Sequence, residues 1–189
     1  MAEKTEKKSG NQIVKLALVL LAVAAIMAFV LGIVNEITKD RIAEIAAEKT
    51  ATAYANVLPA DDYATEVETD DTSITKMVVA KDASGETVGY VAETTFSGAQ
   101  GMITMVIGLD NDLTCTGVYI TKHSETSGLG AKAAETTEGA WRDNVVGYGD
   151  GIALAKDGGE IVAISGATIT SRAVVNEVQA VINAAKSLG

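Results

Sequence analysis

The segment SGATITS at Ser165–Ser171 concentrates four hydroxyl side chains and one glycine in seven residues. It leads into Arg172–Leu188, where apolar residues recur at helical spacing and predict an amphipathic helix. A helix N-terminus presents unpaired backbone N–H groups and a positive dipole end, and glycine permits close approach, so such a loop suits a phosphate. A simple helix cap by Thr170 or Ser171 is the alternative, and the residues alone leave both interpretations open.

Composition excludes several other kinds of site. The chain has 189 residues and a single cysteine, Cys115, which excludes an internal disulfide and any zinc or iron–sulfur centre built on several thiolates. The single histidine, His123, likewise excludes a multi-histidine haem or metal site. Residues 50–189 carry 8 basic and 19 acidic groups, and this acidic body repels phosphate backbones, so nucleic acid is not an expected partner.

A long apolar run near the N-terminus predicts a membrane anchor. Leu16–Val34 is 19 residues without a charge, and at about 1.5 Å per residue such a helix is close in length to a bilayer core. A cleaved signal peptide is the alternative, but the run exceeds the usual ~7–15 apolar residues and a charged, helix-favouring segment follows it. Four lysines precede the run. The positive-inside rule therefore predicts a single-pass protein of the cell membrane, with a cytoplasmic N-terminus and an extracytoplasmic C-terminal domain.

These features divide the chain into four parts: a cytoplasmic tail at 1–12, a transmembrane helix at 13–34, a juxtamembrane helix at 35–59 and an extracytoplasmic domain at 60–189. Helical character continues to residue 57, and Pro59 ends it. In the domain, short turns separate segments of strand character and so predict antiparallel pairing. These segments are Lys76–Ala80, Glu86–Phe96, Gly101–Asp110 and Leu113–Thr121.

The whole chain is expected to have an α+β fold, in which one N-terminal transmembrane helix precedes an antiparallel sheet packed with helices. The acidic run Asp61–Asp71 is expected to be a solvated loop. Two short helices are expected within Ala131–Val146, with Trp141 in the core, and a short strand is expected at Glu160–Ile164. Cys115 alternates with apolar residues in its strand and is expected in the core rather than as a redox thiol.

The longer stretch SGATITSRAV resembles the flavinylation motif of the FMN-binding domain family, which includes the G subunit of the Rnf complex and the C subunit of the sodium-pumping NADH:quinone oxidoreductase. HSETSGLGAK at His123–Lys132 resembles the family's H-x-E-T-P-G-L-G segment, which lies near the flavin ring. Gly89–Tyr90 and Phe96–Gly98 match a third family pattern. In that family, the threonine that ends the SGAT tetrapeptide bears FMN through a phosphoester bond, which a flavin transferase makes from FAD. Thr168 holds this position here.

The resemblance implies a set of cofactor-binding residues around the attachment point. Gly128 and Gly130 would let the backbone approach a flat ring, and Leu129 would pack on its face. Glu125 and Thr126 would hydrogen-bond the polar ring edges. The full set is Thr168 (covalent FMN phosphoester), Ser165, Gly166, Ala167, Thr170, Glu125, Thr126, Gly128, Leu129 and Gly130. Metal ligands and catalytic residues are not expected.

The resemblance also implies a function. The chain would be the electron-carrier subunit of a membrane-bound Rnf-type ferredoxin:NAD+ oxidoreductase that couples electron transfer to ion translocation, with covalent FMN on Thr168. Its partners would be the other membrane subunits of an Rnf-type complex, the lipid bilayer and, for maturation, a flavin transferase. The alternatives are a C-type subunit of the sodium-pumping NADH:quinone oxidoreductase, an extracytoplasmic flavoprotein reductase and a non-redox membrane-anchored scaffold.

Overall fold

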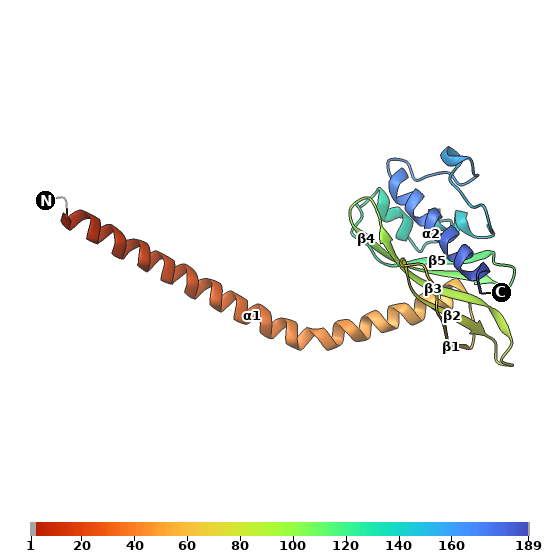
Figure 1. Cartoon of the computed structure of the whole chain (residues 1–189), viewed down its shortest axis with the longest axis horizontal. Helices are drawn as coiled ribbons and strands as arrows, with labels where there is room; N and C mark the ends of the chain where they lie inside the picture. Colours follow the sequence, from red (N-terminus) through yellow and green to blue (C-terminus); the bar gives the residue numbers. More distant parts are fainter. Residues whose placement is uncertain (1–2, 189) are drawn as a thin grey trace. The chain divides into compact units, whose positions relative to one another are not determined.

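The computed structural model describes residues 3–188, and the side chains of residues 12–188 (Figure 1). Its contacts divide the chain into two compact units, one ending at Ala47 and one beginning at Glu48. From residue 3 onward, the first unit consists of helix only. The second contains the end of that helix, a five-stranded sheet and a C-terminal helix, so the chain has the expected α+β fold.

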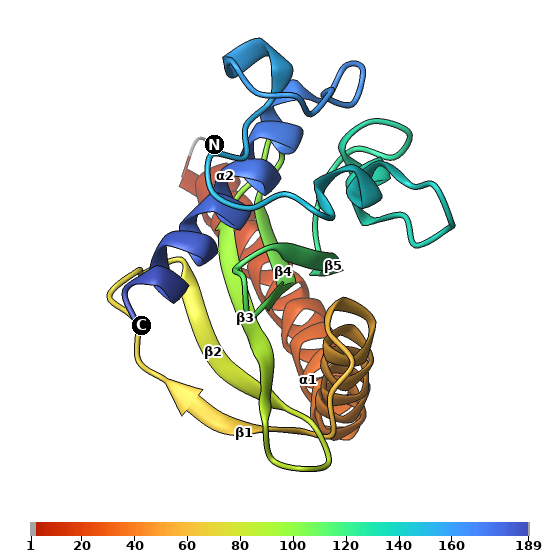
Figure 2. The same ribbon diagram turned by 90° about the vertical axis from the view of Figure 1, so that its right-hand side faces the viewer.

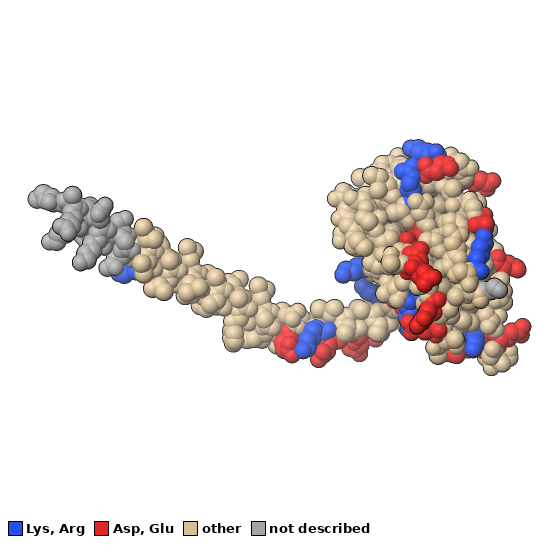
Figure 3. All heavy atoms as spheres, in the orientation of Figure 1, with Lys and Arg blue, Asp and Glu red and all other residues tan. Residues whose placement is uncertain are grey.

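Helix α1 (Glu3–Val57) is unbroken over both predicted helical segments. It is long and apolar enough to cross a membrane, by length and composition, and no charged side chain interrupts its apolar stretch (Figure 3). After this stretch, the Lys39 and Arg41 side chains pair with Glu36 and Glu44 one turn away, each at 2.5 Å. The helix stops before Pro59, which has no backbone N–H and disfavours helical geometry in the residue before it.

The sheet is antiparallel throughout, with its strands in chain order from one edge to the other. The strands are β1 (Asp62–Val67), β2 (Ile74–Lys81), β3 (Thr87–Ser97), β4 (Met102–Asp110) and β5 (Cys115–Lys122). Strands β2 to β5 confirm the four predicted strands. The expectation of a loop over the whole acidic run was wrong, because β1 pairs with β2 there. As an exposed edge strand, β1 lacks the apolar alternation that identifies a half-buried strand.

One face of the sheet packs against helix α2 (Thr168–Lys186), which lies across the strands in Figure 2. The main core cluster combines α2 residues such as Val178 and Ile182 with Met77, Met105 and Ile107 from the strands, all at most 1% exposed. Cys115 belongs to this cluster at 1% exposure, as expected. The core therefore fixes α2, and with it the segment that immediately precedes the helix.

The opposite face packs against the last turns of α1. Tyr54 and Val57 are buried there with strand residues that alternate with those of the main core, among them Val78, Val91 and Val106. The Tyr54 hydroxyl donates to Glu93 Oε1 at 2.6 Å, and burial and this bond raise the Tyr54 pKa. Residues 48–57 are therefore part of the folded domain, because they cover an otherwise exposed apolar sheet face.

Three short 3-10 helices lie between β5 and α2: η1 (Gly130–Ala134), η2 (Trp141–Val145) and η3 (Ala155–Asp157). The first two confirm the predicted pair of short helices, and Trp141 packs half-buried against the core. The strand expected at Glu160–Ile164 was wrong, since only an isolated bridge joins Ile161 to Leu154. Ile161 and Ile164 of that segment are buried by packing in the main core rather than by pairing within a sheet, and Val162 between them is exposed.

Candidate functional site

The SGATITS segment forms the loop before α2 and the first turn of that helix. Helix α2 begins at Thr168, four residues earlier than the sequence predicted, with Ala167 as its N-cap residue. Ala167 offers no hydroxyl to the helix start, so Thr170 and Ser171 do not cap it, contrary to the simpler interpretation. The first helical bond runs from Ser171 N–H to Ala167 O at 3.0 Å. The amides of residues 168–170 therefore have no partner inside the helix.

Two features hold this loop in shape. Gly166 has φ of 76°, a left-handed conformation that glycine adopts without strain. The Ser171 hydroxyl donates to Ala167 O at 3.0 Å and accepts from Ile164 N–H at 3.0 Å. This serine therefore closes the loop from inside, and its side chain is fully buried. Sequence reasoning considered it only as a cap, because the bond to Ile164 depends on the folded loop.

The second motif lies beside this loop. The N–H groups of Leu129 and Ala131 both donate to Thr126 O, at 3.1 and 3.2 Å, and Gly128 with φ of 76° completes the turn. A Cβ added to Gly166 would meet the Leu129 side chain at 3.0 Å. Leu129 thus lies directly against the SGAT loop, and it keeps 42% of its surface exposed.

Glu125 connects the two motifs. This residue is 9% exposed, and its carboxylate accepts hydrogen bonds from the Thr170 hydroxyl at 2.7 Å and from the Gln100 backbone N–H at 3.1 Å. The Glu125 N–H in turn donates to His123 Nδ1 at 3.2 Å. The expected site residues Glu125 and Thr170 are therefore in direct contact with each other.

The ten expected site residues lie in these adjoining segments but differ in accessibility. Thr168 is half-buried. The exposed members are Ser165, Gly166, Thr126, Gly128 and Leu129, and the buried members are Ala167, Thr170, Glu125 and Gly130. Sequence reasoning missed Ile169, which directly follows Thr168 and is 63% exposed. The sequence does contain a sign of this residue's exposure. Ile169 is apolar, yet it lies outside the apolar stripe that the later valines of the helix define.

The third family pattern is divided by the fold. Gly98 lies in the β3–β4 turn close to Glu125, while Gly89 and Tyr90 pair with Asp110 and Leu109 near the other end of β3. At ~3.3 Å per residue, the two ends of that pattern are roughly 25–30 Å apart. Only its Gly98 end therefore lies at the candidate site.

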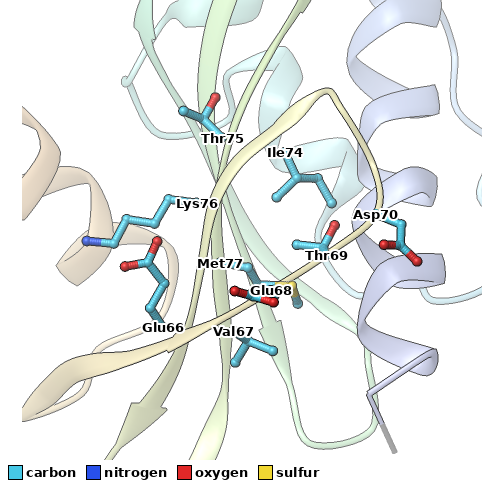
Figure 4. Close-up of a pocket in the computed structure, with 9 residues that line it drawn as sticks. All are labelled: Glu66, Val67, Glu68, Thr69, Asp70, Ile74, Thr75, Lys76 and Met77. Atoms are coloured by element: carbon cyan, nitrogen blue, oxygen red, sulfur yellow. The ribbon is translucent and has the colours of Figure 1, made fainter.

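A groove of about 520 Å³ lies at the connection from β1 to β2 and shares no residue with the two motifs (Figure 4). The carboxylates of Glu66, Glu68 and Asp70 line it together with the Lys76 ammonium. Three carboxylates against one ammonium disfavour an anionic ligand. The groove is therefore a poor site for a phosphate-bearing cofactor.

The chain combines three features: a long apolar N-terminal helix, an antiparallel sheet, and a Ser/Gly/Thr loop at a helix N-terminus. Together they define the class of FMN-binding domain proteins with an N-terminal membrane helix. The family model described as an FMN-binding domain matches residues 98–183, and the model described as the RnfG N-terminal region matches residues 1–57.

Whole-length relatives make the assignment more specific. The chain is 35% identical over 181 residues to the G subunit of the ion-translocating oxidoreductase complex of Methanosarcina acetivorans, covering 92% of this chain and 95% of that protein. It is 33% identical over 194 residues to the G subunit of the Na(+)-translocating ferredoxin:NAD(+) oxidoreductase complex of Acetobacterium woodii, with 92% of each covered. The chain belongs to the family of Rnf complex G subunits. It is therefore a membrane-anchored electron-transport subunit with an FMN-binding domain, and other Rnf subunits are its partners.

Among solved structures, the NqrC protein of Shewanella oneidensis matches 64% of this chain and 64% of that chain, with a TM-score of 0.44 and 21% identity.

The residues of this site fit a flavin phosphate. The first-turn amides of α2 that have no partner inside the helix suit phosphate oxygens, and Gly166, which has no side chain, lets Leu129 lie directly against the loop. The exposed apolar side chains of Leu129, against the SGAT loop, and Ile169, next to Thr168, suit a flat aromatic ring. The site therefore has both a polar and an apolar part, as FMN requires.

Proposed function

We propose that Thr168 carries FMN through a phosphoester bond and that the domain relays electrons within an Rnf-type ferredoxin:NAD+ oxidoreductase that couples this transfer to ion translocation. The observation that carries the proposal is the position of Thr168. Thr168 is half-buried and is the first residue of α2, beside amides that have no partner inside the helix. The identity to whole-length G subunits, one of them from a ferredoxin:NAD(+) oxidoreductase complex, supports the assignment to this type of complex.

The attachment itself is a group transfer. Thr168 Oγ1 attacks the flavin-side phosphorus of FAD, forming the threonine–phosphate bond as the pyrophosphate bond breaks and AMP leaves. The hydroxyl proton passes to a base of the flavin transferase or to water. Because threonine is β-branched, its χ1 is stiff, and the bonded oxygen keeps a fixed direction relative to α2.

The neighbouring residues have separate tasks in this proposal. Ser165 and Gly166 leave room for the phosphate, and Ala167 keeps the helix start free of a competing cap. Leu129 covers an apolar ring face, while Thr126 and Gly128 offer polar groups and open backbone at the ring edge. When bound, FMN supplies one- and two-electron redox chemistry, and the protein fixes its position and surroundings.

A covalent bond has a clear physical advantage for an electron carrier. A reversible site with a micromolar dissociation constant holds its ligand by about 8 kcal/mol and empties where free flavin is scarce. Attachment at Thr168 removes this loss and holds the redox group at a constant distance from its partners.

The membrane arrangement forms part of the same proposal. Residues 13–34 cross the bilayer, residues 1–12 remain in the cytoplasm, and the domain from residue 60 onward lies outside it. The lysines before the apolar run support this orientation. The flavin transferase would then meet the folded domain on the extracytoplasmic side.

The test uses full-length protein from its native host, examined by in-gel flavin fluorescence after full denaturation and by intact mass. Wild-type protein and Ser187→Ala should fluoresce and carry the added mass of FMN less one water, because Ser187 lies at the opposite end of α2 from Thr168. Thr168→Ala should lose both signals. A dark, unmodified wild-type band, or a Thr168→Ala band that keeps the flavin, would refute the proposal.

A further inference from the structure

Three loops that are far apart in the sequence meet at one buried carboxylate. The β3–β4 turn contributes the Gln100 N–H, the second motif contributes Glu125 itself, and the first turn of α2 contributes the Thr170 hydroxyl. Two separate carboxylate oxygens make these contacts, Oε1 to Gln100 at 3.1 Å and Oε2 to Thr170 at 2.7 Å. Each oxygen of Glu125 is therefore engaged inside the protein.

Two glycines give this carboxylate its space. A Cβ on Gly98 would overlap Glu125 Oε1, and a Cβ on Gly130 would overlap Glu125 Oε2 and lie 2.8 Å from Thr170 Oγ1. The close approach of Glu125 thus explains why both positions hold glycine. Gly128 differs, since a Cβ there would meet nothing and its left-handed φ of 76° accounts for the residue type.

We propose that Glu125 is a positioning residue, which acts on the flavin attachment site through Thr170 rather than through contact with the ring. This inference rests on the proposed function of Thr168. It replaces the expected hydrogen bond from Glu125 to a ring edge with a bond to the helix that carries the attachment point.

The geometry of a helix explains how the contact reaches Thr168. Successive residues turn by about 100°, so Thr168 and Thr170 point to roughly opposite sides of α2. The exposures agree, since Thr170 is 1% exposed while Thr168 is half-buried and accessible. Holding the Thr170 hydroxyl inward on Glu125 therefore turns the Thr168 hydroxyl outward. The carboxylate is also placed favourably at the positive end of the helix dipole.

The alternative is a direct contact between Glu125 and the ring. Because Glu125 is only 9% exposed, such a contact would require its carboxylate to turn away from Thr170, which is 1% exposed and whose hydroxyl would then lose its partner. The motif offers other polar groups that are accessible, since the neighbouring Ser124, Thr126 and Ser127 are exposed. The burial and the occupied oxygens of Glu125 both favour the positioning role.

The experiment measures the initial rate of flavin incorporation into full-length protein, with purified flavin transferase and FAD, by intact mass. Thr170→Val and Glu125→Ala should each lower this rate at least about tenfold, because a misplaced reacting group loses rate steeply. Thr170→Ser, which keeps the hydroxyl, should remain within about twofold of wild type. The double variant should be no slower than the slower single variant, because both changes break one contact.

A matched control separates positioning from general stability. Val178→Ala changes a fully buried core residue of the same helix, two turns beyond the contact, and should incorporate flavin at the wild-type rate despite a lower melting temperature. The flavin that Glu125→Gln does incorporate should keep the wild-type reduction potential and absorption spectrum. A carboxylate in contact with the ring would shift both.

The outcomes are distinct. A wild-type chain without flavin refutes the proposed function and this inference together. A wild-type chain modified on Thr168, with Thr170→Val and Glu125→Ala modified at the wild-type rate, refutes this inference alone. Slow incorporation in Val178→Ala as well, or a shifted potential in Glu125→Gln with a normal rate in Thr170→Val, would also overturn it.

Discussion

Replacing Gly108 with alanine should weaken the attachment of the end of α1 to the sheet. Gly108 on β4 pairs with Gly117 on β5. Because neither residue has a side chain, the backbone of Val57 can lie close to both. An added Cβ at Gly108 would lie 2.6 Å from both Val57 O and Thr116 Oγ1. These two atoms are joined by a 2.5 Å hydrogen bond. The methyl group would therefore push the helix end away and strain that bond.

The expected size follows from three effects. Overpacking of a filled site costs about 1–3 kcal/mol. Loss of the bond from the Thr116 hydroxyl to Val57 O adds about 0.5–1.5 kcal/mol. Replacing glycine with alanine also lowers the conformational entropy of the unfolded chain, which stabilises the folded protein by about 0.4–1 kcal/mol. The net loss in the free energy of unfolding should be about 0.5–4 kcal/mol, which corresponds to a melting temperature lower by roughly 1–16 °C.

The assay is urea unfolding of the full-length protein in detergent, followed by the fluorescence of Trp141, the single tryptophan. Gly149→Ala is the matched control, because a Cβ there would meet nothing closer than Leu113 O at 3.8 Å. Limited trypsin digestion at Lys49 provides a second measure and should be faster in Gly108→Ala. Equal stability and equal digestion of the two variants would show that the close contact at Val57 does not limit stability.

Two further predictions concern buried groups on the other face of the sheet. Burial raises the pKa of Glu177 on α2, and the nearby Asp71 adds to the rise, so the folded protein disfavours the charged form. Glu177→Gln should therefore stabilise the protein by about 1 kcal/mol at pH 8, and the gain should vanish as pH falls to the unfolded carboxyl pKa near ~4.3. Urea unfolding at several pH values checks this, and a gain that does not change with pH would contradict it. Burial also raises the pKa of Cys115 to about 12. Its thiolate fraction at pH 8 is thus about a thousandfold below that of an ordinary thiol, and iodoacetamide should modify it only in urea, as intact mass would show.

The sequence alone predicted the parts of the fold that depend on local pattern. The uncharged run Leu16–Val34 specifies an apolar helix, and the alternating segments between short turns specify four strands and their antiparallel pairing. The edge strand β1 was missed because its exposed, acidic residues lack the alternation of a half-buried strand. The start of α2 was placed four residues late, because small hydroxyl residues favour turns as readily as a first helical turn.

In the candidate site, too, some features follow from the sequence and others only from the tertiary structure. The resemblance of SGAT and HSETSGLG to family motifs selected Thr168 and the two loops, because the order of residues in these motifs is a property of the sequence. The sequence could not assign a partner to Glu125, since Gln100 and Thr170 lie 25 and 45 residues away from it. Such contacts form only when the sheet and α2 pack together, so the tertiary structure alone determines that one buried glutamate joins three loops beside the helix turn that holds Thr168.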